Sequence, residues 1–280
     1  MTSPYILRPG RWSDITEILE IQSHSLDDFA QAQFSYPFRR QYPNHFKSAM
    51  EASPRRKLAE NGGKSFNIII EHRESGKVAG WGFWRRNVGE EYENKMEKYS
   101  SIAAGGYKDA YSEGGTKEPG AGGEESELSN PAASRARLLL SNRCVIHDSI
   151  THFSAPHWYL SHLLVHPDFM RQGLGSILTL WGMRKAKDEG LPAFLTASVE
   201  GERLYSRLGW RQIGARTFPK LEDMSEKDRK AEEEFFGKEE LEMQFNIAPP
   251  LVMEWGSYES DAEVFLRYQQ QMQMISDMLS

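Results

Sequence analysis

The fold of this chain is decided by LSHLLVHPDFMRQGLGSILTLWGMRKAKDEG (residues 160–190) and by LPAFLTASVEGERLYSRLGW (residues 191–210), which follows it directly. The first segment begins with an apolar strand over Leu160–Val165. A break and a basic turn that contains Gly173 and Gly175 come next, and an amphipathic helix follows the turn. The second segment predicts another strand and a short helix. This order of strand, turn, helix and strand is typical of an α/β domain.

The glycine turn predicts an anion site at the start of the helix. Gly173 and Gly175 let the backbone approach a ligand closely and turn successive N–H groups toward it. The helix adds its unpaired first-turn donors and the positive end of its dipole. The dinucleotide fingerprint does not fit, because Leu178 stands where its last glycine would be, and no Gly-Lys-Ser/Thr follows as in a phosphate-binding NTPase loop. The turn therefore predicts anion binding of another kind.

The order and spacing of these motifs resemble the GNAT superfamily of acyl-CoA-dependent N-acyltransferases, and in particular its small-molecule acetyltransferases of fungal type. The resemblance includes the motif L-Y-x-x-x-G-aromatic at residues 204–210 and extends over residues 5–29, 66–86 and 157–215. It implies an α/β fold with a mixed, mostly antiparallel central sheet. That sheet would be splayed between its fourth and fifth strands and flanked by helices, with a long insertion before the fourth strand.

The resemblance also implies acetyl-CoA as co-substrate. In the family a turn of the pattern (Gln/Arg)-x-x-Gly-x-(Gly/Ala) holds the pyrophosphate, and here a methionine stands at its first position. The pantetheine arm is expected in the gap between the fourth and fifth strands. The residues expected to contact acetyl-CoA are Leu163, Leu164 and Val165 on the strand, and Met170, Arg171, Gln172, Gly173, Leu174, Gly175 and Ser176 in the turn.

The same resemblance assigns catalytic candidates. An amine must lose a proton to attack, the oxyanion that forms needs donors, and the leaving thiolate is helped by an acid. Tyr205 is the candidate acid, because a phenol with a pKa of about 10 is protonated at neutral pH; the alternative is a structural tyrosine. For the base, His157, Ser161, His162 and a water chain stay open. Strand alternation puts His157 and Ser161 on one face and His162 on the other, unless a bulge reverses the parity.

Composition limits the class of protein. Lys and Arg number 34 against 40 Asp and Glu, for a net charge of −6. This balance argues against general nucleic-acid binding. Cys144 is the single cysteine, so we expect a reducing, cytoplasmic environment. No apolar run approaches the roughly 20 residues that a membrane-spanning helix needs. We expect no membrane partner and no metal site.

We expect a single acetyltransferase domain over residues 1–256 with two insertions. The insertion near residues 88–135 is Gly-rich and acidic, which predicts a disordered segment or a mobile flap. The insertion near 220–240 is highly charged and predicts a solvated helix or loop. Between them, Leu138–Ile146 could be helix or strand. Residues 257–280 predict a C-terminal helix with a narrow apolar stripe that either docks on the protein's own core or forms a homodimer.

Two arms rich in β-forming residues, Phe66–Glu71 and Lys77–Arg85, lie on either side of the polar turn Glu74-Ser75-Gly76 and predict a β-hairpin. On the second arm, Trp81, Phe83 and Trp84 either form a wall of the acceptor pocket or fill the core.

The leading functional hypothesis is transfer of an acetyl group from acetyl-CoA to a primary amine of a small molecule, by direct attack in a ternary complex. A protein or peptide N-acetyltransferase is the nearest alternative. A catalytically weak acyl-CoA-binding module is an alternative of a different class.

Overall fold

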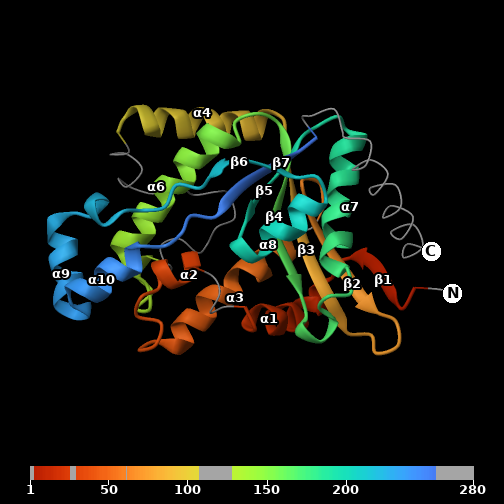
Figure 1. Cartoon of the computed structure of the whole chain (residues 1–280), viewed down its shortest axis with the longest axis horizontal. Coiled ribbons are helices and arrows are strands. Elements are labelled where there is room, and N and C mark those ends of the chain that lie inside the picture. Colours follow the sequence, from red (N-terminus) through yellow and green to blue (C-terminus); the bar gives the residue numbers. More distant parts are fainter. Residues whose placement is uncertain (1–2, 26–29, 61, 107–127, 257–280) are drawn as a thin grey trace.

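The computed structural model describes residues 3–25, 30–60, 62–106 and 128–256. Their strands form one seven-stranded sheet with helices packed against both faces (Figure 1). The strands are β1 (Tyr5–Pro9), β2 (Ser65–His72), β3 (Val78–Asn87), β4 (His157–Val165), β5 (Ala193–Ala197), β6 (Arg211–Ala215) and β7 (Leu251–Trp255). The α-helices are α1 (Ile15–Ser23), α2 (Ala30–Ser35), α3 (Pro43–Ala59), α4 (Glu90–Ala104), α6 (Arg135–His152), α7 (Leu174–Asp188), α8 (Val199–Arg207), α9 (Glu226–Phe236) and α10 (Lys238–Phe245).

The sheet has the order β1-β2-β3-β4-β5-β7-β6. Neighbouring strands are antiparallel except β4 and β5, which are parallel. The parallel pair is short, since its register runs only from Trp158 opposite Ala193 to Leu160 opposite Leu195. Beyond Leu160 the two strands diverge. The structure thus confirms the expected mixed, mostly antiparallel sheet that opens between its fourth and fifth strands.

Helix α7 covers one face of the sheet, and α1 and α3 lie on the other (Figure 1). On the α7 side the helix approaches the sheet closely, because a Cβ at Gly182 would lie 2.1 Å from the Trp84 ring. On the α1 side Trp81 and Phe83 are fully buried with Ile18. The three aromatic side chains of β3 therefore point to opposite faces, and only Trp81 and Phe83 are on the α1 and α3 side.

A β-bulge at Ser161 changes which side chains of β4 share a face. Phe83 pairs with His162 but the next β3 residue, Trp84, pairs with Leu160, so Ser161 has no partner on β3. Strict alternation from His157 is therefore wrong beyond Leu160. His157 and His162 lie on the face opposite α7, because the extra residue shifts the side-chain parity by one.

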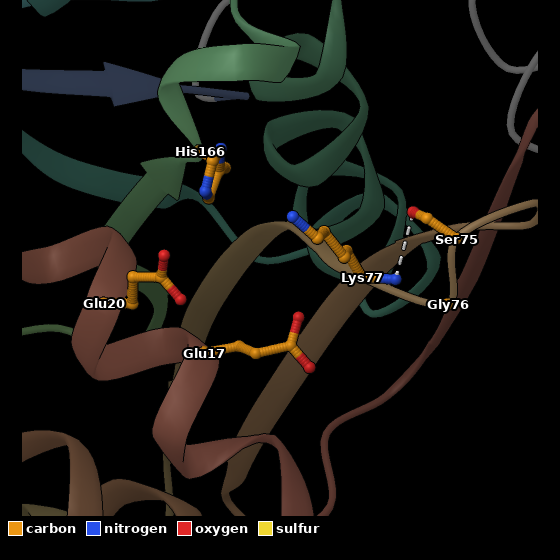
Figure 2. Close-up of a pocket in the computed structure, with 6 residues that line it drawn as sticks. All are labelled: Glu17, Glu20, Ser75, Gly76, Lys77 and His166. Atoms are coloured by element: carbon orange, nitrogen blue, oxygen red, sulfur yellow. Dashed lines mark hydrogen bonds between the residues drawn. The ribbon is translucent and has the colours of Figure 1, made fainter.

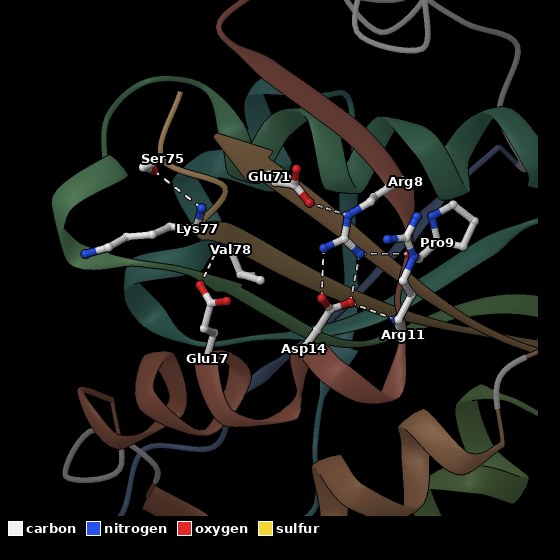
Figure 3. A network of polar contacts seen from close by, with 9 residues as sticks. All are labelled: Arg8, Pro9, Arg11, Asp14, Glu17, Glu71, Ser75, Lys77 and Val78. Atoms are coloured by element: carbon white, nitrogen blue, oxygen red, sulfur yellow. Dashed lines mark hydrogen bonds and ion pairs between the residues drawn. The ribbon is translucent and has the colours of Figure 1, made fainter. Parts of the chain in front are cut away.

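A polar network holds the first strand and helix to the hairpin of β2 and β3 (Figure 3). The Arg8 guanidinium donates two 2.8 Å hydrogen bonds to the Asp14 carboxylate and a 2.6 Å bond to Glu71 on β2. Asp14 also accepts from the Arg11 backbone N–H at 2.7 Å. Since charged, bidentate hydrogen bonds of this kind are directional, they orient the start of α1 against the sheet edge.

The first insertion is partly helical. Helix α4 packs on α6 through a cluster of apolar side chains that consists of Tyr92, Met96, Tyr99, Ile102 and Ile146. The segment Leu138–Ile146, for which helix and strand were both open, lies inside α6. Residues 107–127, the middle of the expected mobile flap, and residues 257–280, the expected C-terminal helix, lie outside the described residues.

The charged second insertion forms α9 and α10, which lie beside α2 and one end of α6 (Figure 1). Its acidic run is not wholly solvated. Glu232 is 7% exposed and accepts hydrogen bonds from the fully buried Arg137 on α6 at 2.8 Å and from Ser134 at 2.6 Å. The Arg137 guanidinium also lies 5.2 Å from the Phe34 ring and 5.1 Å from the Phe245 ring. This ion pair fastens the insertion to the domain.

We expect Glu232→Ala to destabilise the protein by about 3–5 kcal/mol, because it leaves the Arg137 charge buried without its partner. Glu233→Ala is the matched control, since Glu233 is on the same helix and only pairs with Arg229 at 3.8 Å on the surface. Urea unfolding of both variants measures the difference. Equal, small losses would contradict a buried pair.

Candidate functional site

The turn between β4 and α7 has a residue in the left-handed conformation on each side of Gln172. Arg171 has φ 60° and Gly173 has φ 81°. A left-handed conformation is unusual for a residue with a side chain, and here it changes the direction of the backbone just before the helix. The Tyr5 hydroxyl donates a 2.5 Å hydrogen bond to Gln172 Oε1, which holds the turn against β1.

Gly173 is the N-cap residue of α7 and has no side chain that could cap the helix. The first-turn N–H groups of a helix have no intrahelical acceptor, so Leu174, Gly175 and Ser176 carry donors for a ligand. A Cβ at Gly173 would meet nothing within 4 Å, whereas one at Gly175 would lie 3.3 Å from Leu204. The turn is thus open at Gly173 and closely packed on α8 at Gly175.

The predicted turn residues lie together at this helix start. Met170, Arg171, Gln172 and Gly173 are exposed. Leu174 is buried under the turn, and Gly175 and Ser176 are half-buried. The positive side chain of Arg171 and the α7 donors give this corner the charge that an anion requires.

Beyond Leu160 no strand of the described part of the chain pairs with the edge of β4 that faces β5, since β5 pairs only up to Leu160. Leu163, Leu164 and Val165 lie along this edge and pair with β3 on their other side. In an antiparallel pair, alternate residues turn their N–H and C=O groups away from the partner. The gap therefore presents backbone hydrogen-bonding groups, as the predicted main-chain contacts require.

Tyr205 lies on α8 and closes one side of this region. It is 7% exposed, and its ring is 6.1 Å from the Trp210 ring. No hydrogen bond involves its hydroxyl group within residues 3–25, 30–60, 62–106 and 128–256. Burial, and then the neighbouring Tyr159, raise the pKa of Tyr205 above its ordinary value, so the phenol stays protonated at neutral pH and can donate.

Ser161 and His162 form a hydrogen-bonded pair at the bulge. The Ser161 hydroxyl lies 3.1 Å from Nδ1 of His162, and the imidazole is 5.5 Å from the Trp81 ring. Burial, with the nearby charges of Lys57 and Arg85, holds the pKa of His162 well below its ordinary value. His162 is therefore neutral at physiological pH and has a nitrogen for the serine proton.

His157 is a different case, because both of its ring nitrogens are already engaged. Nδ1 donates to the Ala155 carbonyl at 2.7 Å, and Nε2 accepts from the Asn87 side-chain amide at 2.9 Å. The residue is 1% exposed, and burial lowers its pKa to about 4. The bulge lies between His157 and the gap, and His157 is at the end of β4 that still pairs with β5. It has the surroundings of a structural histidine.

A separate pocket of about 210 Å³ lies between α1, the β2–β3 hairpin and the end of β4 (Figure 2). Near it, Glu20, His24 and His166 bring possible metal-ligand atoms within 4.8 Å of one another. However, Nδ1 of His166 accepts a 3.1 Å hydrogen bond from the Asp168 N–H. The neutral ring then carries its proton on Nε2 and offers no second lone pair. We assign no metal to this cluster.

Two parts of the site had no sequence signal. Tyr159 on β4 and Thr196 on β5 bridge the strands through a 3.0 Å contact between their hydroxyl groups, close to where the sheet opens. Lys57 comes from α3, in a region whose sequence has no clean period. Their positions follow from the strand register and from helix packing, which no local motif encodes.

Comparison with known proteins finds a family match over part of the chain. Residues 138–210 match the model of the acetyltransferase (GNAT) family. A solved structure described as histone acetyltransferase HPA2 and related acetyltransferase, from Corynebacterium glutamicum, superposes with a TM-score of 0.53 at 15% identity, over 94% of this chain and 99% of that one.

Two further structures are similar at lower scores. A mosquito protein described as arylalkylamine N-acetyltransferase like 5b has a TM-score of 0.45 at 15% identity, covering 90% of this chain and 99% of that one. An agmatine N-acetyltransferase has 0.47 at 13% identity, covering 90% and 98%. None of the described helices is long and apolar enough to cross a membrane.

The family match covers the strand, the glycine turn, the helix and the Tyr205 motif described above, and the likeness to the bacterial structure is one of fold. Residues 138–210 of the chain thus match the acetyltransferase (GNAT) family, and the fold of the chain is similar to that of the bacterial structure.

Proposed function

We propose that this protein transfers the acetyl group of acetyl-CoA to the primary amine of a small molecule, by direct attack within a ternary complex. The observation that carries the proposal is a coincidence of three features beside the open end of β4. These are the left-handed turn that starts α7, the unpaired edge of β4, and a Tyr205 hydroxyl group without a hydrogen bond among the described residues.

The residues around the turn fit the donor. The open space at Gly173 admits a phosphate against the backbone, and the first-turn N–H groups of α7 and the Arg171 side chain supply its hydrogen bonds and charge. Backbone groups of Leu163, Leu164 and Val165 would hold the pantetheine arm in the gap. When bound, acetyl-CoA supplies a thioester to be attacked; the protein's part is to orient it.

The acceptor amine is expected to reach the bulge from the face of α1 and α3, because α7 covers the other face. At the bulge Ser161 can take a proton from the amine while passing its own to His162, at the observed 3.1 Å separation. Backbone N–H groups on the open edge of β4 are available to the oxyanion that forms. His157 is not assigned to this step, since its nitrogens are occupied.

Tyr205 is assigned as the acid that assists the departing thiolate. A thiol has a pKa of about 8.5, so the leaving sulfur ends as a thiol at neutral pH. The raised pKa of Tyr205 keeps its hydroxyl group protonated, so that it can donate a hydrogen bond to the developing thiolate, and solvent supplies the proton that the sulfur finally takes.

A small acceptor is favoured over an extended peptide by the first insertion. Phe153, directly after α6, packs on Phe194 of β5 and on Tyr159 of β4, with ring centroids 5.7 Å and 5.3 Å apart. The α4–α6 pair therefore covers the face of the sheet opposite α7 beside the gap, and it leaves less room for an acceptor to enter. One continuous sheet also supports the assignment of residues 1–256 to one domain. Homodimerisation through residues 257–280 stays a prediction.

The first experiment is calorimetric titration with acetyl-CoA. We expect the wild-type protein to bind with a Kd on the order of micromolar, and a Gly173→Asp, Gly175→Asp variant to show no binding, since both carboxylates would oppose the phosphates. Gly190→Asp is the matched control, because Gly190 has φ 66° at the other end of α7. Failure of the wild type to bind would contradict the cofactor site and favour an interaction role.

If Tyr205 is the acid, Tyr205→Phe should lower kcat about 100-fold and leave the Kd for acetyl-CoA unchanged. Tyr99→Phe is the control, as it removes the hydroxyl of another buried tyrosine on α4, away from the gap. Steady-state kinetics with a panel of small amines and peptides measures both variants and identifies the acceptor class. Unchanged kcat in Tyr205→Phe would make Tyr205 structural. Binding without turnover of any acceptor would support the weak acyl-CoA-binding module.

A further inference from the structure

A pair of hydroxyl groups bridges β4 and β5 at the point where the sheet opens. The Tyr159 hydroxyl lies 3.0 Å from the hydroxyl of Thr196. In the strand register Tyr159 is opposite Phe194, and the last paired residues are Leu160 and Leu195. Thr196 is therefore the first β5 residue beyond the paired part. The bridge thus runs from the paired end of the two strands to the first position of the gap.

This bridge is on the face of the sheet opposite α7. Leu160 and Leu195 belong to the main core on the α7 side. Because side chains alternate along a strand, the neighbouring Tyr159 and Thr196 point to the other face. The ring of Tyr159 is held there by Phe153, with ring centroids 5.3 Å apart. Tyr159 is thus fixed at its ring by packing and at its hydroxyl by Thr196.

The gap between β4 and β5 has an open end and a closed end. At the open end β4 runs into the turn that starts α7, where Arg171 and the first-turn N–H groups suit a phosphate. At the closed end the pairing of β4 with β5 begins, at Leu160. If the phosphates lie at the open end, the pantetheine arm runs toward the closed end. The acyl group is then the part of the donor nearest to the bridge.

The assigned position of the sulfur agrees with this direction. Helix α8, which carries Tyr205, packs on β5. Tyr205 is buried in the main core together with Leu195 and Ala197, which are on either side of Thr196 in the sequence. After burial, Tyr159 is the neighbour that raises the pKa of Tyr205. A sulfur atom next to the Tyr205 hydroxyl therefore starts the acyl chain close to the bridge.

An acyl chain longer than acetyl would meet a wall on three sides. In the plane of the sheet it meets the paired backbones of β4 and β5. On the α7 side Leu160 is 4% exposed and Leu195 is 1% exposed, so that side is filled by the main core. On the opposite side it meets the half-buried side chains of Tyr159 and Thr196. The bridge is the wall that a substitution can open without disturbing the main core.

We propose that the Tyr159–Thr196 bridge limits the donor to short acyl groups, so that the protein uses acetyl-CoA and discriminates against thioesters with longer chains. The inference rests on the proposed function. The reaction is the same for every donor. The amine nitrogen forms the new C–N bond and its proton goes to the Ser161–His162 pair, which returns it to solvent. The C–S bond breaks, and the sulfur takes a proton from solvent.

The first test is the ratio of kcat/KM for acetyl-CoA to kcat/KM for butyryl-CoA, measured with one amine from the acceptor panel. The wild type should prefer acetyl-CoA about 100-fold, because two extra methylene groups do not fit. Tyr159→Leu shortens the side chain but keeps an apolar group beside Phe153, and it should remove most of this preference. Thr196→Val keeps the volume but unties the Tyr159 ring, and it should reduce the preference about 10-fold.

Tyr99→Leu is the matched control. It makes the same substitution in the separate apolar cluster between α4 and α6, and its donor ratio should equal that of the wild type. Both rates in a ratio are measured on one enzyme preparation. A loss of folded protein in any variant therefore cancels, and the ratio reports only on the space for the acyl chain.

Binding supplies a readout that needs no turnover. In calorimetric titration the wild type should bind butyryl-CoA about 10-fold more weakly than acetyl-CoA. Tyr159→Leu should bind both thioesters with the same Kd. CoA itself has no acyl group, so its Kd should be the same for the wild type and for Tyr159→Leu.

A wild type that uses butyryl-CoA as well as acetyl-CoA would overturn the inference, and so would a donor ratio in Tyr159→Leu equal to that of the wild type. Both results leave the proposed acetyl transfer standing. A wild type that binds acetyl-CoA but acetylates no amine would instead overturn the proposed function. The titrations with the two thioesters then still decide whether the bridge limits the acyl chain, so the two failures are distinguishable.

Discussion

The site depends on one extra residue in β4. Ser161 bulges out of the ladder with β3, and from that point β4 no longer pairs with β5. A bulge increases the local twist of a strand and shifts its side-chain parity. Here both effects are used together: the twist opens the sheet, and the shift turns His162 toward the face that α7 leaves free. Without the bulge, His162 would point into the α7 core.

The opening of the sheet also affects the position of the turn that follows β4. Because β4 runs directly into the loop before α7, the direction of its last residues sets where the α7 N-terminus points. Two left-handed residues, Arg171 and Gly173, complete the reversal, and the Tyr5–Gln172 hydrogen bond braces the loop from β1. The anion corner at the helix start and the unpaired strand edge are therefore consecutive parts of one chain segment, and a long ligand can follow both.

Local motifs predicted the parts of this arrangement that depend on neighbours in sequence. Gly173 and Gly175 predicted the turn, and the β-forming residues of Phe66–Glu71 and Lys77–Arg85 predicted the hairpin of β2 and β3; the structure contains both. The site around the bulge was harder. A bulge has no residue signature at Ser161. Alternation put His157 and Ser161 on one face and His162 on the other unless a bulge reversed the parity, and the structure contains that bulge.

Contacts between segments that are distant in sequence could not be predicted either, because no local pattern marks them. Arg137 and Glu232 are far apart in sequence, and each belongs to a helix with many charges, so nothing marked this pair as the buried one. Lys57 was equally unmarked among the arginines and lysines of α3. What distinguishes it is only its place under Phe83, which depends on how α3 crosses the sheet.

The charge of the buried face bears on the form of the acceptor. An ammonium ion entering the region near Lys57 and Arg85 would meet positive charge, and Glu60, the carboxylate that acts on Lys57, already pairs with Arg85. A neutral amine meets no such repulsion. On the proposed function, the local charge near the bulge therefore favours a neutral amine, which is the form that can attack the thioester. The overall net charge of −6 acts in the other direction and attracts cations to the protein.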